Sequence, residues 1–332
     1  MILHPAVVAL VAGSALGSAL LLFAAWHGAA VLRGWDLASG SALQLSLERR
    51  TYLISTLVGL VLAFELLSLL LFVRTADVLA PLFTGAMCAA GTLAADVWGY
   101  PALLLRLLVA VLAGLWLVVN HADQLGHDYP IIRAKYALLL GLAPFFLAEA
   151  WLQARFFAGL SPEVITSCCG SLFSRGGAGP GALLAALPPA AAGGALYLTS
   201  ALAVAAGLAF VATGRSAAAL GLAVASAVAA AAGLVGVVSF VSPYVYELPA
   251  HRCPFCLLQA EYRWIGYPLY AALLGGAVAG MGAGMLTPFR RHASLATTLP
   301  SLQRRLAWIA TVLFGAFAAI TALLVVTSRL RS

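Results

Sequence analysis

The chain has 332 residues, of which 63% are hydrophobic and only 9% are charged, and its formal net charge is +7. A soluble domain carries about 25% charged residues, so this composition excludes a water-soluble globular protein. The positive charge is spread over the polar breaks between apolar runs, which is typical of charges that flank membrane helices and not of a nucleic-acid-binding surface. We therefore expect the lipid bilayer as a partner and no nucleic acid.

Long, continuous apolar runs predict an all-α fold, a polytopic transmembrane helix bundle with about nine spans and a range of eight to ten. A span needs roughly 20 apolar residues, and a helix satisfies its own backbone hydrogen bonds in lipid. The expected spans are 6–26, 52–73, 78–98, 101–120, 136–157, 190–213, 217–241, 267–286 and a last one that ends near residue 327. We divide the chain into an N-terminal four-helix region (1–135), a cysteine-bearing four-helix region (136–287) and a basic loop with the last helix (288–332).

Basic residues give a first indication of orientation. The loop between the last two expected spans carries Arg290, Arg291, Arg304 and Arg305. These arginines favour a cytoplasmic loop, whereas Arg49, Arg50 and the C-terminal arginines oppose that orientation. The segment between the spans 136–157 and 190–213 carries Cys168 and Cys169, and the segment between 217–241 and 267–286 carries Cys253 and Cys256. In either orientation, two spans separate these segments, so both lie on the same side of the membrane. We expect the cysteines of both connections on one side, the periplasmic side of a bacterial-type inner membrane.

The sharpest local motif is Cys253-Pro254-Phe255-Cys256, preceded by His251 and Arg252. Proline suits the first turn of a helix, which would place Cys253 at the N-cap and Cys256 within the first turn. The positive end of a helix and the neighbouring basic side chains should lower the pKa of the Cys253 thiol. The motif therefore predicts a reactive thiol pair.

The other three cysteines have different surroundings. Cys168 and Cys169 are adjacent, and Ser161-Pro162-Glu163 before them predicts the start of a short helix over 162–173. Adjacent cysteines can pair with other thiols or bind a soft metal ion. Cys88 lies among small residues inside the expected third span, and we interpret it as a buried packing residue.

The order of these elements resembles that of the VKOR and DsbB group of membrane thiol oxidoreductases. Over residues 136–287 a span is followed by Cys168 and Cys169, then by two spans, and then by Cys253 and Cys256 at the start of another span. The resemblance implies that Cys253 and Cys256 exchange electrons with a bound quinone. It also implies that Cys168 and Cys169 pass disulfides to a thioredoxin-like partner. The first four spans have no counterpart in that group.

Two other functions remain open. A soft-metal transporter or metal chaperone would use the four paired cysteines and His251 as ligands, and the vicinal cysteines resemble those of small mercury-uptake membrane proteins. A non-catalytic membrane subunit would use the same cysteines in structural disulfides. Haem is less favoured because it needs axial histidines on facing helices, and none of the histidines is expected in mid-span.

Ionisable residues also fall inside the expected spans, where they are functional candidates by default. Glu65 lies in the second span, Arg106 in the fourth and Glu149 in the fifth. We assign Arg106 and Glu149 a supporting role, either in a charge pair that fixes helix packing or in a proton path.

Overall fold

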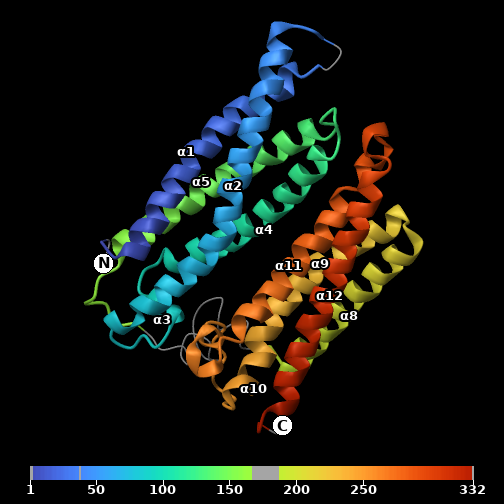
Figure 1. Cartoon of the computed structure of the whole chain (residues 1–332). Coiled ribbons are helices and arrows are strands. Elements are labelled where there is room, and N and C mark those ends of the chain that lie inside the picture. The colour runs from blue at the N-terminus through green and yellow to red at the C-terminus, as the bar shows by residue number, and fades with distance from the viewer. Residues whose placement is uncertain (1–2, 37–38, 167–186, 331–332) are drawn as a thin grey trace. The chain divides into compact units, whose positions relative to one another are not determined.

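The computed structural model describes residues 3–36, 39–166 and 187–330, and this part of the chain is built from helices and turns (Figure 1). The long helices are α1 (Pro5–Gly34), α2 (Ala42–Leu79), α4 (Gly99–Gln124), α5 (Ile132–Gly159), α8 (Pro189–Thr213), α9 (Ser216–Gly236), α11 (Gly266–Met285) and α12 (Thr298–Thr327). The short ones are η1 (Ala80–Leu82), α3 (Ala89–Ala94), η2 (Val237–Val241), α10 (Ser242–Tyr246), η3 (Cys256–Leu258), η4 (Ala260–Tyr262), η5 (Thr287–Arg291) and η6 (Ala293–Leu295). Among the described residues, eight helices are long and apolar enough to cross a membrane. The all-helical prediction is confirmed, and the number of candidate spans lies at the lower end of the expected range.

The expected third span, residues 78–98, is not a long helix. The second helix begins at Ala42, ten residues before the expected start, and continues to Leu79. Pro81 then forces a tighter turn, Gly85 adopts a φ of +90°, and α3 has only six residues. Proline disfavours the α conformation of the residue before it, and a positive φ favours glycine. The prediction was wrong here because average hydropathy does not register these two breaks.

Two compact units can be distinguished along the chain. The first comprises Met1–Thr75, Asp96–Ser161 and Pro288–Leu299. Within it, α5 packs against both α1 and α4, and the core includes Leu62, Trp116 and Phe146, which are almost fully buried. Short connections make successive helices of this unit antiparallel, as Figure 1 shows for α4 and α5.

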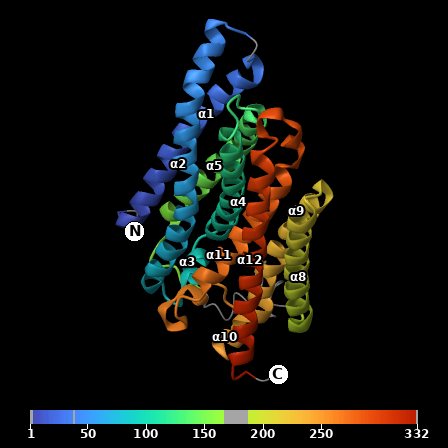
Figure 2. The same cartoon turned by 45° about the vertical axis from the view of Figure 1, so that its right-hand side comes forward.

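The second unit comprises Ala76–Ala95, Pro162–Thr287 and Pro300–Ser332. In this unit α9 packs against α8 and α11, and Figure 2 shows α8 and α9 as an antiparallel hairpin. The contact between α9 and α11 is very close, because a Cβ atom built on Gly280 would lie only 1.9 Å from Ser226 Oγ. Small residues allow membrane helices to approach in this way.

A π-helical turn, η2, joins α9 to α10, which ends shortly before the cysteine motif. Pro243 follows this turn and has no N–H to donate, so the regular hydrogen-bond ladder cannot continue. Val237 O in this turn accepts both the backbone N–H of Ser242 and, at 2.7 Å, its Oγ hydroxyl. Glu247 then ends α10 with a φ of 55°.

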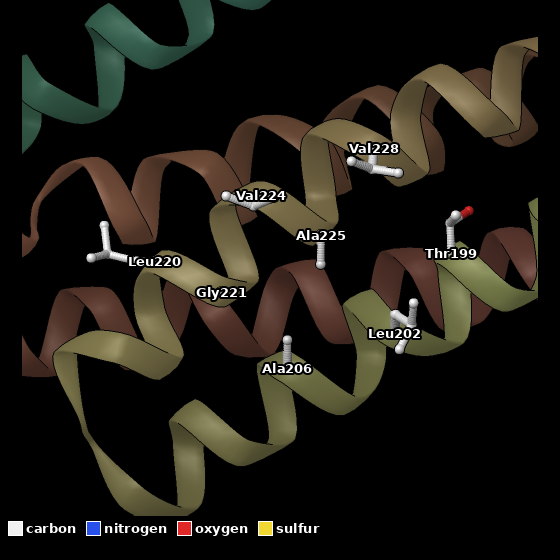
Figure 3. Close-up of a pocket in the computed structure, with 8 residues that line it drawn as sticks. All are labelled: Thr199, Leu202, Ala206, Leu220, Gly221, Val224, Ala225 and Val228. Atoms are coloured by element: carbon white, nitrogen blue, oxygen red, sulfur yellow. The ribbon is translucent and has the colours of Figure 1, made fainter.

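An apolar groove of about 630 Å³ lies between α8 and α9 (Figure 3). Its lining is Thr199, Leu202, Ala206, Leu220, Gly221, Val224, Ala225 and Val228. The single hydroxyl, Thr199 Oγ1, donates to the carbonyl of Ala195 in its own helix at 2.7 Å. These lining residues therefore offer a lipid-like chain a surface but offer a metal ion no ligand.

Candidate functional site: a buried thiol cluster

Three cysteine side chains of the second unit converge, and we call Cys88, Cys253 and Cys256 the thiol cluster. Their sulfur atoms all lie within 4.8 Å of one another, and the Sγ atoms of Cys88 and Cys253 are 3.5 Å apart. A disulfide bond is about 2.05 Å long, so these two sulfurs are not bonded to each other. The relative exposures of the three residues are 0%, 0% and 5%. The chain thus buries three thiols from two distant segments at one point.

The local structure around Cys253 differs from the expectation. The long helix α11 begins only at Gly266, and Cys256 instead opens the three-residue turn η3. The extended backbone of Gln259 and the left-handed Arg263 separate this turn from the helix. Cys253 is therefore not a helix N-cap, and the expected stabilisation of its thiolate by a helix dipole has no structural basis.

Cys88 stands in extended conformation directly before α3, in the segment where a span was expected. The chain around Thr166 holds this segment. Thr166 donates its N–H to Thr84 O at 3.0 Å and its hydroxyl to Gly91 O at 2.8 Å. A side chain at Gly85 would collide with Thr166 O. The close approach of the Thr166 backbone therefore explains why position 85, three residues before Cys88, is a glycine.

A small polar bridge joins the two cysteine-bearing segments. Asp77 Oδ1, near the end of α2, accepts the N–H of Ala89 at 3.3 Å and the Nε2 amide of Gln259 at 2.9 Å. The same amide group also donates to Met87 O at 3.2 Å. Ala89 follows Cys88 and Gln259 lies three residues after Cys256. Asp77 and Gln259 therefore fix the spacing between the two segments.

Tyrosine hydroxyls hold the backbone of the Cys-Pro-Phe-Cys segment itself. Tyr246 donates to Cys253 O at 2.5 Å, and Tyr270 of α11 donates to Pro254 O at 2.8 Å. Buried carbonyl groups need such partners, because an unsatisfied one costs about as much as a lost hydrogen bond. The two hydroxyls therefore fix the backbone on which Cys253 is mounted.

The two basic neighbours of the motif have different surroundings. Burial lowers the pKa of His251, against a smaller opposing effect of nearby Cys88, so its imidazole carries less charge than an exposed histidine would. Its ring packs edge-on against Tyr246 with centroids 4.4 Å apart. Arg252 is 7% exposed, and its Nε donates to Pro249 O at 3.5 Å. Among the described residues, the group of potential ligands within 4.8 Å consists of the three cysteines and does not include His251.

The structure brings together part of the predicted site. Cys253 and Cys256 meet as expected, and Cys88, interpreted from sequence as a packing residue, joins them. Cys168 and Cys169 lie outside the described residues. Arg106 and Glu149 belong to the first unit, where they pair with each other.

Sequence reasoning missed Cys88, Asp77 and Gln259. Pro81 and Gly85 could have moved Cys88 from a span to a loop, since both interrupt the apolar run. For Asp77 and Gln259 no local signal exists, because their role depends on a contact across 182 positions of the chain.

The cluster can support two kinds of chemistry. Thiolates bind soft ions such as Cu(I), and three of them at metal–sulfur distances of about 2.3 Å would stand about 4 Å apart. Two thiols at 3.5 Å can also be oxidised to a disulfide after a small movement.

Comparison with known proteins gives no match for this chain: no protein-family model, no curated protein and no solved structure matches it.

Proposed function

We propose that this chain is a multi-pass membrane protein that binds and handles a soft metal ion of the Cu(I) type, with Cys88, Cys253 and Cys256 as its ligands. The observation that carries the proposal is the convergence of three buried sulfurs within 4.8 Å. Three thiolates in a plane suit Cu(I), whereas a structural zinc ion takes four ligands in tetrahedral geometry. The class of function is that of a membrane metal transporter or metal chaperone.

Burial favours metal binding over disulfide exchange with a soluble protein. Exchange requires an attacking thiolate to reach a sulfur atom of the cluster, and the three residues are at most 5% exposed. A small ion can instead enter by successive ligand exchange.

Arginine distribution supports an extracytoplasmic cluster. If eight spans alternate in direction, the connections after α1, α4, α8 and α11 fall on the opposite side of the membrane from the connections that carry the thiol cluster. Arginines within or close to these connections are Arg33, Arg49, Arg50, Arg133, Arg215, Arg290, Arg291, Arg304 and Arg305. Without the expected third span, Arg49 and Arg50 no longer oppose the positive-inside rule, whereas Arg329 after α12 still does. The proposed location is an inner membrane with the cluster facing the periplasm.

A Cu(I) titration tests the proposal. The full chain is purified in lipid nanodiscs under reducing conditions and titrated with Cu(I) against a chromophoric chelator, and the bound ion is characterised by X-ray absorption. We expect one tightly bound ion with sulfur ligands only. Each single change, Cys88→Ser, Cys253→Ser or Cys256→Ser, should weaken binding more than about 100-fold, because losing a ligand costs more than losing its supporting contact.

The control is the double variant Cys168→Ser/Cys169→Ser, which leaves the thiol cluster intact and should keep the bound ion. Binding that is lost in this variant but retained in Cys88→Ser would refute the proposed ligand set. Absence of a tightly bound ion in the wild-type protein would refute the function.

The 3.5 Å separation of Cys88 and Cys253 favours a second candidate, a thiol–quinone oxidoreductase. In that reaction two thiols lose two protons and two electrons and form one disulfide. A quinone accepts the two protons and the two electrons and becomes a quinol. Cys168 and Cys169 would then exchange with a thioredoxin-like partner.

The distances between the sulfur atoms predict which disulfide would form first in that reaction. The first disulfide formed under mild quinone oxidation should join Cys88 to Cys253, not the two cysteines of the Cys-Pro-Phe-Cys motif. Thiol trapping followed by peptide mass spectrometry identifies the pair. A protein whose three thiols stay reduced under every quinone challenge would exclude this candidate and leave metal binding unaffected.

A further inference from the structure

The first unit contains a second buried polar group that is independent of the thiol cluster. Arg106 of α4 lies between two carboxyl groups, those of Glu65 on α2 and Glu149 on α5. Arg106 Nε is 3.2 Å from Glu65 Oε1, and Arg106 Nη2 is 2.9 Å from Glu149 Oε1. All three side chains are at most 1% exposed. We call these three residues the carboxyl–arginine cluster.

The charges in this cluster do not balance if both acids are ionised. α1 contributes uncharged groups: the Ser14 hydroxyl accepts from Arg106 Nη2 at 3.4 Å and from Gln153 Nε2 at 2.8 Å, and Leu10 O accepts from the same Gln153 amide at 3.1 Å. α2 and α5 contribute the two acids, and α4 contributes the single cation. The guanidinium carbon of Arg106 also lies over the Phe72 ring, 5.0 Å from the ring centroid. Two carboxylates and one guanidinium leave one uncompensated negative charge in an apolar interior, where such a charge is strongly disfavoured.

A second buried ion pair in the same unit has balanced charge and uses both oxygens of its carboxylate. Lys135 Nζ donates to Asp123 Oδ2 at 2.5 Å, and the other oxygen of Asp123 accepts the N–H of Ile131 at 2.9 Å. This pair contains one acid and one base, and both carboxylate oxygens are used. It provides a matched comparison, because it is equally buried and lies in the same unit.

The carboxyl–arginine cluster, in contrast, retains unused hydrogen-bonding capacity. Glu149 Oε2, Arg106 Nη1 and the Gln153 side-chain oxygen are buried and make no hydrogen bond with any of the residues that the structure describes. A carboxylic acid proton on either acid would remove the surplus charge and supply a donor to such an oxygen. The unpartnered oxygens can accept a hydrogen bond from a bound proton, and one proton also balances the charge of the cluster.

We propose that Glu65 and Glu149 together bind one exchangeable proton, so that the first unit contains a proton-binding site within the membrane. With the proton bound, the cluster has one neutral acid, one carboxylate and one guanidinium, and its net charge is zero. When the proton leaves for solvent, the net charge becomes −1. The site lies about 10 Å from the Gly99 end of α4, since Arg106 is seven residues from that end and a helix rises about 1.5 Å per residue.

Infrared spectroscopy of the full chain in nanodiscs tests the proposal directly. The C=O stretch of a protonated carboxyl group falls where few other protein groups absorb, and it shifts in deuterated water. We expect such a band at neutral pH in the wild type and in Asp123→Asn, the matched control. It should be lost or strongly reduced in Glu149→Gln and in Glu65→Gln, in each of which the remaining acid can ionise beside Arg106.

Stability provides a second readout that a purely structural ion pair would not give. Raising the pH removes the shared proton and leaves a buried surplus charge, so the wild-type protein should lose stability at high pH. Glu149→Gln should be folded and should lack that pH-dependent loss.

Any one of three results overturns the proposal. The first is the absence of a protonated-carboxyl band from the wild type at every pH at which it is folded. The second is a band that persists in both glutamine variants. A band that sodium chloride abolishes at constant ionic strength would also overturn it, because the site would then bind a metal cation instead of a proton.

Discussion

Replacement of Gly280 by alanine should loosen the contact between α9 and α11. The added Cβ atom would lie 1.9 Å from Ser226 Oγ and 2.7 Å from Ser226 Cβ. Rotating the serine hydroxyl relieves only the first clash, so the helices themselves must separate. Overpacking of this kind costs typically 1–3 kcal/mol, and the better helix propensity of alanine returns about 1 kcal/mol. Because backbone movement is required, we take the upper figure and expect a net loss of about 2 kcal/mol, roughly 30-fold in the unfolding equilibrium.

The assay is reversible unfolding of the full chain in mixed micelles, followed by circular dichroism. Gly221→Ala in α9 is the control, because a Cβ built there meets no described atom within 4 Å apart from its own stretch of helix. In a Ser226→Gly background the Gly280→Ala change should cost less than about 1 kcal/mol, since the two residues are in contact and their effects are not additive. The reasoning is refuted if Gly280→Ala is as stable as Gly221→Ala, or if Ser226→Gly does not restore stability.

Three further predictions follow from the polar contacts and the topology. Gln259→Ala removes the bridge to Asp77 and should weaken Cu(I) binding about 10- to 100-fold in chelator competition, because supporting contacts of metal ligands have effects of that size; unchanged affinity would mean that other contacts hold the loop. Lys135→Met strands the buried Asp123 carboxylate and should cost about 3–5 kcal/mol in mixed-micelle unfolding. The double variant with Asp123→Asn should recover most of that loss, and equal losses in both variants would contradict a charge-pair explanation. In intact cells an impermeant maleimide should label Ala260→Cys but not Ser216→Cys until the membrane is permeabilised, and the reverse pattern would invert the proposed orientation.

Composition and the length of the apolar runs predicted most of the helical architecture, because a segment that crosses a lipid bilayer must be apolar, helical and about 20 residues long. A chain with few charges must present apolar helices, and eight of the nine expected spans correspond to long helices, although α2 begins ten residues earlier than expected. The rule fails between Val78 and Trp98, where hydropathy is high enough for a span. There Pro81 and Gly85 interrupt the helix, and backbone conformation outweighs hydrophobicity.

The candidate site was less accessible to sequence reasoning. Cys253 and Cys256 could be selected from their spacing, but their expected position at a helix start was wrong because α11 begins at Gly266. Cys88 could not be selected, since its importance depends on a tertiary contact that joins two loops. The buried charged residues were easier to predict. Glu65, Arg106 and Glu149 stand out individually because ionisable residues are rare in apolar runs. Only the structure shows that the two glutamates share the one arginine.

The thiol cluster also has a consequence for biosynthesis. Cys88 and Cys253 are 165 positions apart, so the two segments cannot meet until the chain between them has been made and inserted. At about 5–20 residues per second, translation of that interval takes roughly 8–33 s. During this time the Cys88 thiol lacks the neighbours that later enclose it and is open to oxidants on its side of the membrane. Assembly of the cluster is therefore a late event, and its yield should depend on the redox conditions that the unfinished chain encounters.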